Sequence, residues 1–97
     1  MKKLVSTPRF EKAFRKFARR NLPLQQKIED ALAQLGDDAF AVSLGTHKLE
    51  GKLSGTLACS CGYDCRILFK FDRDEETEED VILLLDIGTH EIGRAHV

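Results

Sequence analysis

Residues 81–90, Val-Ile-Leu-Leu-Leu-Asp-Ile-Gly-Thr-His, are the most informative segment for predicting the fold. The run from Val81 to Ile87 is too apolar for a surface strand and too short for most helices. It therefore predicts a central strand that is covered on both faces. A polar ending, Gly88-Thr89-His90, follows this strand directly.

A second apolar segment, Leu57–Phe71, precedes this strand and is separated from it by an acidic turn. Near its end, the side chains are expected to alternate between the two faces of a strand. Ile67, Phe69 and Phe71 point one way, and Asp64, Arg66, Leu68 and Lys70 point the other. A sheet with this pattern displays Asp64 and Arg66 on one face, with His90 just past the end of a neighbouring strand. These polar groups on a rigid sheet are the first candidates for a functional site.

Two amphipathic helices are predicted before these segments. Thr7-Pro8 starts the first helix, because threonine accepts a first-turn N–H and proline at the first helical position sacrifices no hydrogen bond. Asn21-Leu22-Pro23 separates the helices, and Gly36 is expected to stop the second one. Each helix has one apolar stripe: Phe10, Ala13, Phe14 and Phe17 in the first, and Leu24, Ile28, Ala31, Leu32 and Leu35 in the second.

The predicted order of elements is β-α-α-β-β-β, in one domain. A strand at Lys2–Ser6 comes first, and after the helices the loop Asp37–Thr46 is expected to pack on them through its apolar residues, Ala39, Phe40, Val42 and Leu44. A bent extended segment, His47–Gly55, leads into strands at Thr56–Cys61, Asp64–Phe71 and Val81–Ile87. Successive strands joined by short turns pair antiparallel, so the fold class is α+β, with two N-terminal helices packed on an antiparallel-rich sheet.

The formal net charge of −1 hides two opposite ends. Eight Lys or Arg and a single Glu lie between Met1 and Arg20, whereas seven acids and a single Arg lie between Asp72 and Asp80. No apolar run approaches the ~20 residues that span a bilayer, and Arg9, Glu11 and Lys12 interrupt any export signal. The sequence predicts a cytoplasmic protein without a membrane partner.

Three cysteines, Cys59, Cys61 and Cys65, lie close together. An odd number without an export signal argues against a disulfide framework. Zinc is one alternative, with a histidine as fourth ligand, although the spacing differs from the usual pair of pairs. We favour the other reading, in which Cys59 and Cys61 are small core residues, and we predict no metal site.

Five segments, in this order and spacing, resemble the RelE/YafQ family of type II toxins, bacterial endonucleases that cut messenger RNA in the ribosome. The segments are Ser6-Thr7-Pro8-Arg9-Phe10, His47-Lys48-Leu49-Glu50-Gly51-Lys52-Leu53-Ser54-Gly55, Gly62-Tyr63-Asp64, Arg66-Ile67-Leu68-Phe69 and Asp86-Ile87-Gly88-Thr89-His90. The similarity extends through His90 and is greatest to the YafQ-like subgroup. It implies the RelE-like fold, and it implies catalytic or RNA-contacting roles for His47, Asp64, Arg66 and His90. Some YafQ-like members carry a histidine at the position of Ser60 and a tryptophan at that of Cys65.

The resemblance also implies a reaction that uses no metal and no cofactor. The 2′-hydroxyl of the RNA attacks its own adjacent phosphate and expels the 5′-oxygen, which requires a base, an acid and positive charge on the phosphoryl oxygens. His90 is assigned as the acid and Arg66 as the phosphate clamp. Either His47 or Asp64 serves as the base.

The partners implied by the resemblance are a cognate antitoxin, the ribosome and messenger RNA, with operator DNA contacted only through the antitoxin complex. Five cationic residues are predicted to contact ribosomal or messenger RNA: Arg15, Arg19, Arg20, Lys48 and Lys52. Two alternatives remain. One is a ParE-like toxin that inhibits DNA gyrase, and the other is a catalytically inactive module that binds an antitoxin or RNA.

The end of the chain departs from the family, whose members usually finish with an aromatic residue shortly after the histidine. Residues 92–97, Ile-Gly-Arg-Ala-His-Val, are the translation of a common short-read sequencing adapter that continues with a stop codon. We therefore predict a toxin domain over residues 1–90 and a non-native tail over 91–97, in which His96 has no functional role.

Overall fold

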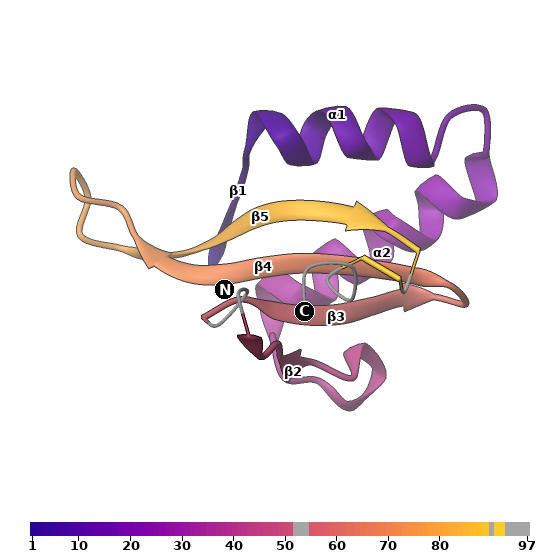
Figure 1. The fold of residues 1–97 in the computed structure, drawn as a ribbon. Coiled ribbons are helices and arrows are strands. Elements are labelled where there is room, and N and C mark those ends of the chain that lie inside the picture. Colours follow the sequence, from indigo (N-terminus) through magenta and orange to yellow (C-terminus); the bar gives the residue numbers. More distant parts are fainter. Residues whose placement is uncertain (52–54, 90, 93–97) are drawn as a thin grey trace.

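The computed structural model describes residues 1–51, 55–89 and 91–92. Its elements, in chain order, are β1 (Lys3–Ser6), α1 (Pro8–Phe17), α2 (Leu22–Asp37), the 3₁₀ helix η1 (Val42–Leu44), β2 (His47–Lys48), β3 (Leu57–Gly62), β4 (Cys65–Arg73) and β5 (Asp80–Gly88) (Figure 1). The predicted α+β class and element order are confirmed. The structure adds the short strand β2 at the start of the segment expected to be bent and extended.

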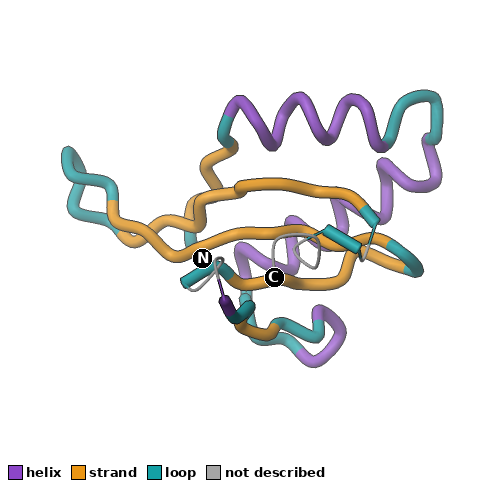
Figure 2. Tube along the Cα trace, viewed as in Figure 1, coloured by secondary structure: helices purple, strands orange, loops and turns teal. Residues whose placement is uncertain are grey.

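One five-stranded sheet carries the fold, in the order β1-β5-β4-β3-β2 (Figure 2). β1 pairs parallel to β5, and the other three neighbouring pairs are antiparallel. β5 lies between β1 and β4, so the stretch Val81–Ile87 forms an interior strand, as predicted. α1 and α2 connect β1 to the strands that follow, so β1 and β5 run in the same direction although they are far apart in the sequence.

Both helices begin at the predicted caps. The hydroxyl of Thr7 accepts a hydrogen bond from the Phe10 amide at 3.1 Å and donates one to the Leu84 carbonyl at 2.8 Å, so the cap also ties α1 to β5. The Asn21 side chain accepts from the Leu24 amide at 3.1 Å at the start of α2. These side chains satisfy amide groups that a helix start leaves without a partner.

The core lies between the helices and one face of the sheet. Phe10 of α1 and Ile28 and Leu35 of α2 are buried against Ile67 and Phe69 of β4. α1 packs on β5, whereas α2 packs on β3 and β1. Within the described residues, no helix combines the length and the apolar character that crossing a membrane requires.

Two expectations about the region after α2 were wrong. Gly36 does not stop the helix: it lies inside α2, which ends at Asp37. Its lack of a side chain serves packing instead, since a Cβ would lie 3.3 Å from the Lys2 carbonyl oxygen. In the following loop Leu44 is buried as expected, but Phe40 and Val42 are 62% and 97% exposed.

The expectation that the cysteines form no disulfide was also wrong. Cys61 and Cys65 are joined by a disulfide, while Cys59 is a free, buried thiol. The two bonded residues flank the turn between β3 and β4, where an antiparallel pair brings their Cα atoms to 5.0 Å, inside the range that a disulfide spans. The bond also removes two of the three sulfur ligands that a zinc site would use.

Candidate functional site

The candidate site lies on the sheet face that points away from the helix-packed core. Cys59 and Ile67 point into that core, so their strand neighbours Ser60 and Arg66 point to the opposite face. Arg66 stands opposite Ser60 of β3 and Gly88 of β5, which places the three residues in one row across three strands. The row lies at the end of the sheet where β3 turns into β4.

A recess of about 330 Å³ opens at this end of the sheet. Its lining includes three of the four residues assigned to catalysis from the sequence: His47, Asp64 and Arg66. The fourth, His90, lies outside the described residues. The register between β4 and β5 places Gly88 beside Arg66, as its Cα partner.

Arg66 is half-buried and donates a hydrogen bond from Nη1 to the Ile92 carbonyl oxygen at 3.0 Å. A main-chain oxygen therefore occupies one donor direction of the guanidinium. Gly88 makes this approach possible, since a Cβ at its position would lie 2.8 Å from Ile92 Cγ2. This hydrogen bond holds the guanidinium on the open face of the sheet, where an anionic ligand could reach its other N–H groups.

His47 is held by a local hydrogen bond. Its Nδ1 lies 3.1 Å from the carbonyl oxygen of Gly45, a residue with φ of 55°. A carbonyl oxygen only accepts, so Nδ1 carries the proton and Nε2 of the neutral ring keeps its lone pair. This is the tautomer that a general base needs, presented from an exposed edge strand.

The turn between β3 and β4 consists of Tyr63 and Asp64. Asp64 has φ of 53°, a left-handed conformation that aspartate tolerates better than most residues, so it forms the turn as well as lining the recess. Tyr63 is 99% exposed and also lines the recess. Tyr63 was not among the site residues predicted from the sequence, although a tyrosine between Gly62 and Asp64 at a hairpin tip could have suggested an exposed ring.

Ser60 is a second residue that the sequence analysis did not assign to the site. Its hydroxyl lies 3.3 Å from both the amide nitrogen and the carbonyl oxygen of Gly62, accepting from the former and donating to the latter. The pairing of β3 with β4 shifts between Ser60 and Gly62, so these bonds brace a bulge directly beside Arg66. Its position between the buried Cys59 and Cys61 was the signal, since alternation turns it to the open face.

Cys59 also lines the recess but its thiol is unsuited to chemistry there. Burial raises the pKa of Cys59 from 9.0 to about 12, because the apolar surroundings disfavour the thiolate. A neutral thiol is a poor nucleophile and a poor metal ligand. Within the described residues, no three histidine, cysteine or acidic side chains are grouped so that they could hold a metal ion.

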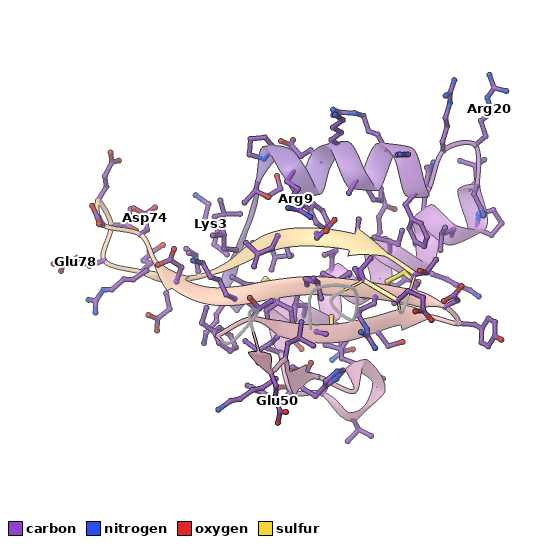
Figure 3. The ribbon with its side chains drawn as sticks, in the orientation of Figure 1. Lys3, Arg9, Arg20, Glu50, Asp74 and Glu78 are labelled. Carbon is purple, nitrogen blue, oxygen red and sulfur yellow. A yellow bond between two sulfur atoms is a disulfide. The ribbon has the colours of Figure 1, made fainter. Side chains whose placement is uncertain are left out.

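The cationic residues predicted to bind RNA form two separate groups. Arg15, Arg19 and Arg20 line a shallow groove of about 680 Å³ where α1 meets α2. Lys48 lies on β2 at the opposite edge of the sheet, and Lys52 lies outside the described residues. Figure 3 shows this separation, with Arg20 beyond the helices and Glu50 beyond β2.

No protein-family model and no curated protein matches the sequence. Solved structures match over nearly the whole chain. A YoeB/ParE toxin from Agrobacterium tumefaciens is 18% identical with a TM-score of 0.73, covering 91% of this chain and 98% of that one. YafQ from E. coli is 13% identical with a TM-score of 0.72, covering 93% and 94%. A chain of the E. coli DinJ–YafQ toxin–antitoxin complex is 14% identical with a TM-score of 0.69, covering 92% of each. At these identities the similarity establishes the fold, and it confirms the predicted RelE-like fold with YafQ among its members.

Proposed function

We propose that this protein is the toxin of a type II toxin–antitoxin system and that it cleaves messenger RNA on the ribosome. Two kinds of evidence support this proposal. Toxins share the fold over almost the entire chain. The sequence motifs that resemble the RelE/YafQ family also converge in space, since His47, Asp64 and Arg66 line one recess.

Arg66 is the observation that carries the proposal. Its guanidinium donors lie on the open face of the sheet, in the middle of a row that crosses three strands. A phosphate offers oxygen acceptors to the same donors and adds negative charge. In this position Arg66 would stabilise the charge that develops on the phosphoryl oxygens during attack by the 2′-hydroxyl.

His47 is the better candidate for the general base. Its bond to Gly45 leaves Nε2 as a proton acceptor, which is what a general base requires. Asp64 is committed to the turn by its left-handed backbone, so its first role is to hold the hairpin tip. His90, two residues after Gly88, is proposed as the acid that protonates the 5′-oxygen as it leaves.

The ribosome would supply orientation that the recess lacks. A recess of about 330 Å³ holds little more than one nucleotide's worth of contacts, so a bound and positioned messenger would lower the entropic barrier to reaction. The groove of Arg15, Arg19 and Arg20 and the separate Lys48 could then contact ribosomal RNA from two sides of the molecule. A cognate antitoxin is proposed as the partner that neutralises the toxin, in keeping with the complex of E. coli DinJ with YafQ.

We further propose that residues 92–97 are not native to the toxin. The Ile92 carbonyl occupies a donor direction of Arg66 that the reaction needs for phosphate. Sequencing the gene from its source tests this directly. An uninterrupted reading frame through Val97 would contradict it, whereas a divergence at or before Ile92 is expected.

Induced expression in bacterial cells tests the function. Protein synthesis, measured by pulse labelling, should fall within minutes, while plasmid supercoiling stays unchanged. The reverse pattern would support the gyrase alternative, and no effect on either would support an inactive binding module. An Arg66→Gln variant at the same expression level should leave protein synthesis intact.

A further inference from the structure

The disulfide at the end of the candidate site has no part in the proposed reaction, yet it closes the hairpin tip that carries the site. We propose that Cys61 and Cys65 are a reversible dithiol–disulfide couple, reduced by a dithiol, that controls how firmly the hairpin tip holds the recess together. The effect on RNA rests on the proposed function, whereas the redox couple itself does not.

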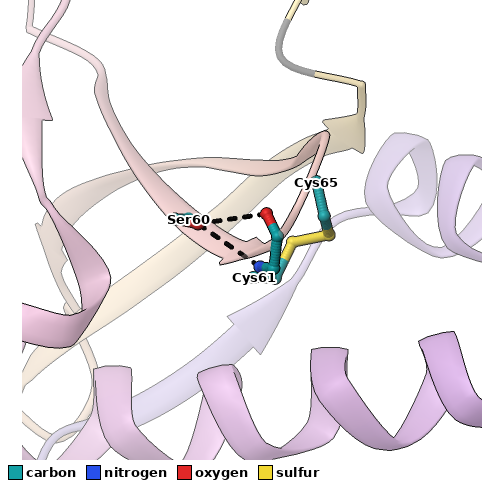
Figure 4. The surroundings of a disulfide bond; sticks show 4 residues. Ser60, Cys61 and Cys65 are labelled. Carbon is teal, nitrogen blue, oxygen red and sulfur yellow. Dashed lines mark hydrogen bonds between the residues drawn. A yellow bond between two sulfur atoms is a disulfide. The ribbon is translucent and has the colours of Figure 1, made fainter.

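The bond joins residues four apart in the chain, directly across the tip (Figure 4). Between them lie Gly62 and Asp64, with φ of 130° and 53°, and the fully exposed Tyr63. The disulfide is the covalent tie across this segment, and the Ser60–Gly62 hydrogen bonds and the Gly62–Cys65 pairing brace the same turn. Opening the bond therefore loosens this segment first.

The bond is not needed for the overall fold. It closes a very short loop, and short loops restrict the unfolded chain least. Cys61 and Cys65 belong to the core that α1 and α2 form with the sheet, but its largest fully buried side chains, among them Phe69, Ile28 and Leu35, lie outside the closed loop. Reduction should thus act locally and leave the folded protein intact.

Cys61 and Cys65 are each 3% exposed, so a reductant reaches the bond when the hairpin tip opens toward the recesses beside it. Cys65 contributes to the recess beside Arg66, and Cys61 contributes to a second recess of about 270 Å³ beside Lys27 and Asp30 of α2. Cys59 is buried as well, and its raised pKa keeps the thiol neutral at physiological pH, so it does not exchange with the pair. The couple is therefore confined to Cys61 and Cys65.

One dithiol molecule supplies both electrons and both protons for reduction of the disulfide. A thiolate of the reductant attacks one sulfur of the pair, forms a mixed disulfide and releases the other cysteine. The second thiol of the reductant then displaces the mixed disulfide. The reductant becomes a disulfide, and Cys61 and Cys65 gain two electrons and two protons. Dithiol proteins of the cytoplasm, where the sequence predicts the chain to act, carry out such exchanges.

Opening the bond affects the candidate site because two of its residues lie in or next to the closed segment. Asp64 lies inside the closed segment and Arg66 follows Cys65 directly. In the oxidised state the recess keeps its geometry, and in the reduced state the tip samples other conformations. We expect the oxidised form to bind RNA about tenfold more tightly, since small misplacements at such sites weaken function by up to about a hundredfold.

The test compares the full chain before and after treatment with dithiothreitol under native conditions. Alkylation with mass spectrometry should show Cys61 and Cys65 labelled after reduction, protected again after oxidation, and Cys59 labelled only after unfolding. Amide hydrogen exchange at Gly62–Arg66 should be at least about tenfold faster in the reduced protein, with the core amides unchanged. Failure of the pair to interconvert, or equal exchange in both states, would overturn the couple.

RNA binding is measured separately, with a short RNA that a 2′-deoxy substitution makes resistant to cleavage. Tighter binding by the oxidised form is expected, and a Cys61→Ser/Cys65→Ser variant should bind weakly with or without dithiothreitol. Equal binding by both forms would overturn the control of the site. If neither form binds RNA while the hairpin tip responds to reduction, the proposed function fails and the redox couple stands.

Discussion

At the scale of single residues, the role proposed for each side chain around the recess follows from where the backbone holds it. Arg66 has cationic donors on a rigid strand, His47 has a fixed tautomer, and Asp64 has a turn to maintain. Alternation along β4 predicted which side Arg66 faces. The hydrogen bond that fixes His47 could not be predicted, because it depends on the left-handed backbone of Gly45 two residues earlier.

Arg66→Gln should lower the rate of RNA cleavage by at least about a hundredfold, because one well-placed donor to a developing oxyanion contributes about this much. Stability should change little, since the side chain is only half-buried. The matched control is Arg73→Gln, which removes the same charge from an exposed position at the far end of β4 and should cleave normally. Equal rates for both variants would remove Arg66 from the mechanism.

Tyr63 offers an exposed ring in the recess that Arg66 lines, where a nucleobase would stack on it if the proposed phosphate site is correct. Tyr63→Ala should weaken binding of a short single-stranded RNA by about tenfold, whereas Tyr63→Phe should retain most of the affinity. Fluorescence anisotropy measures both. Val42→Ala changes another almost fully exposed apolar side chain and should have no effect; a loss of affinity there, or none in Tyr63→Ala, would contradict the stacking role.

Cys59 should lower the free energy of unfolding as the pH rises above 9. Its thiol ionises near pH 9.0 in the unfolded chain but only near pH 12 in the folded protein. Below pH 9 the two states bind the same proton, so stability is unaffected; above pH 9 ionisation favours the unfolded state. Within that window the free energy of unfolding should fall by about 1.4 kcal/mol per pH unit more than in Cys59→Ala. Urea unfolding of the oxidised proteins between pH 8 and about pH 10.5 measures this difference, and parallel curves would refute it.

At the scale of elements, local chemistry predicted helix starts well and helix ends poorly. Thr7 and Asn21 cap as expected because a cap depends on residues three positions away. Gly36 was misassigned because its role depends on the Lys2 carbonyl, just before β1, which comes close to it from a distant part of the sequence. The exposed Phe40 illustrates the same limit, since it pairs with Phe71 of β4, ring centroids 6.0 Å apart, rather than with a helix.

Gly36→Val should destabilise the fold by about 1–3 kcal/mol, because its Cβ would already be tight against Lys2 and its methyl groups have no room. Ala33→Val is the control: it adds the same branched side chain to an exposed position of α2, so it reports helix propensity alone. Thermal unfolding should separate the two variants. Similar melting temperatures would show that β1 and α2 can separate at little cost.

At the scale of the whole molecule, the fold was predictable because its pattern is consistent from end to end. Two amphipathic helices, a strand before them and antiparallel strands after them leave few α+β arrangements. The parallel pairing of β1 with β5 and the separation of the two basic groups were not predictable, since both follow from the strand order in the assembled sheet. The disulfide was missed for a related reason: it depends on the register at the β3–β4 turn.

The central claim is that this protein cuts messenger RNA on the ribosome using the open face around Arg66. Primer extension on a defined messenger RNA, incubated with the purified protein with and without translating ribosomes, tests it most directly. We expect cuts only with ribosomes, in register with codons, and none with Arg66→Gln. Cuts that appear without ribosomes, or that persist in Arg66→Gln at the unchanged rate, would contradict it.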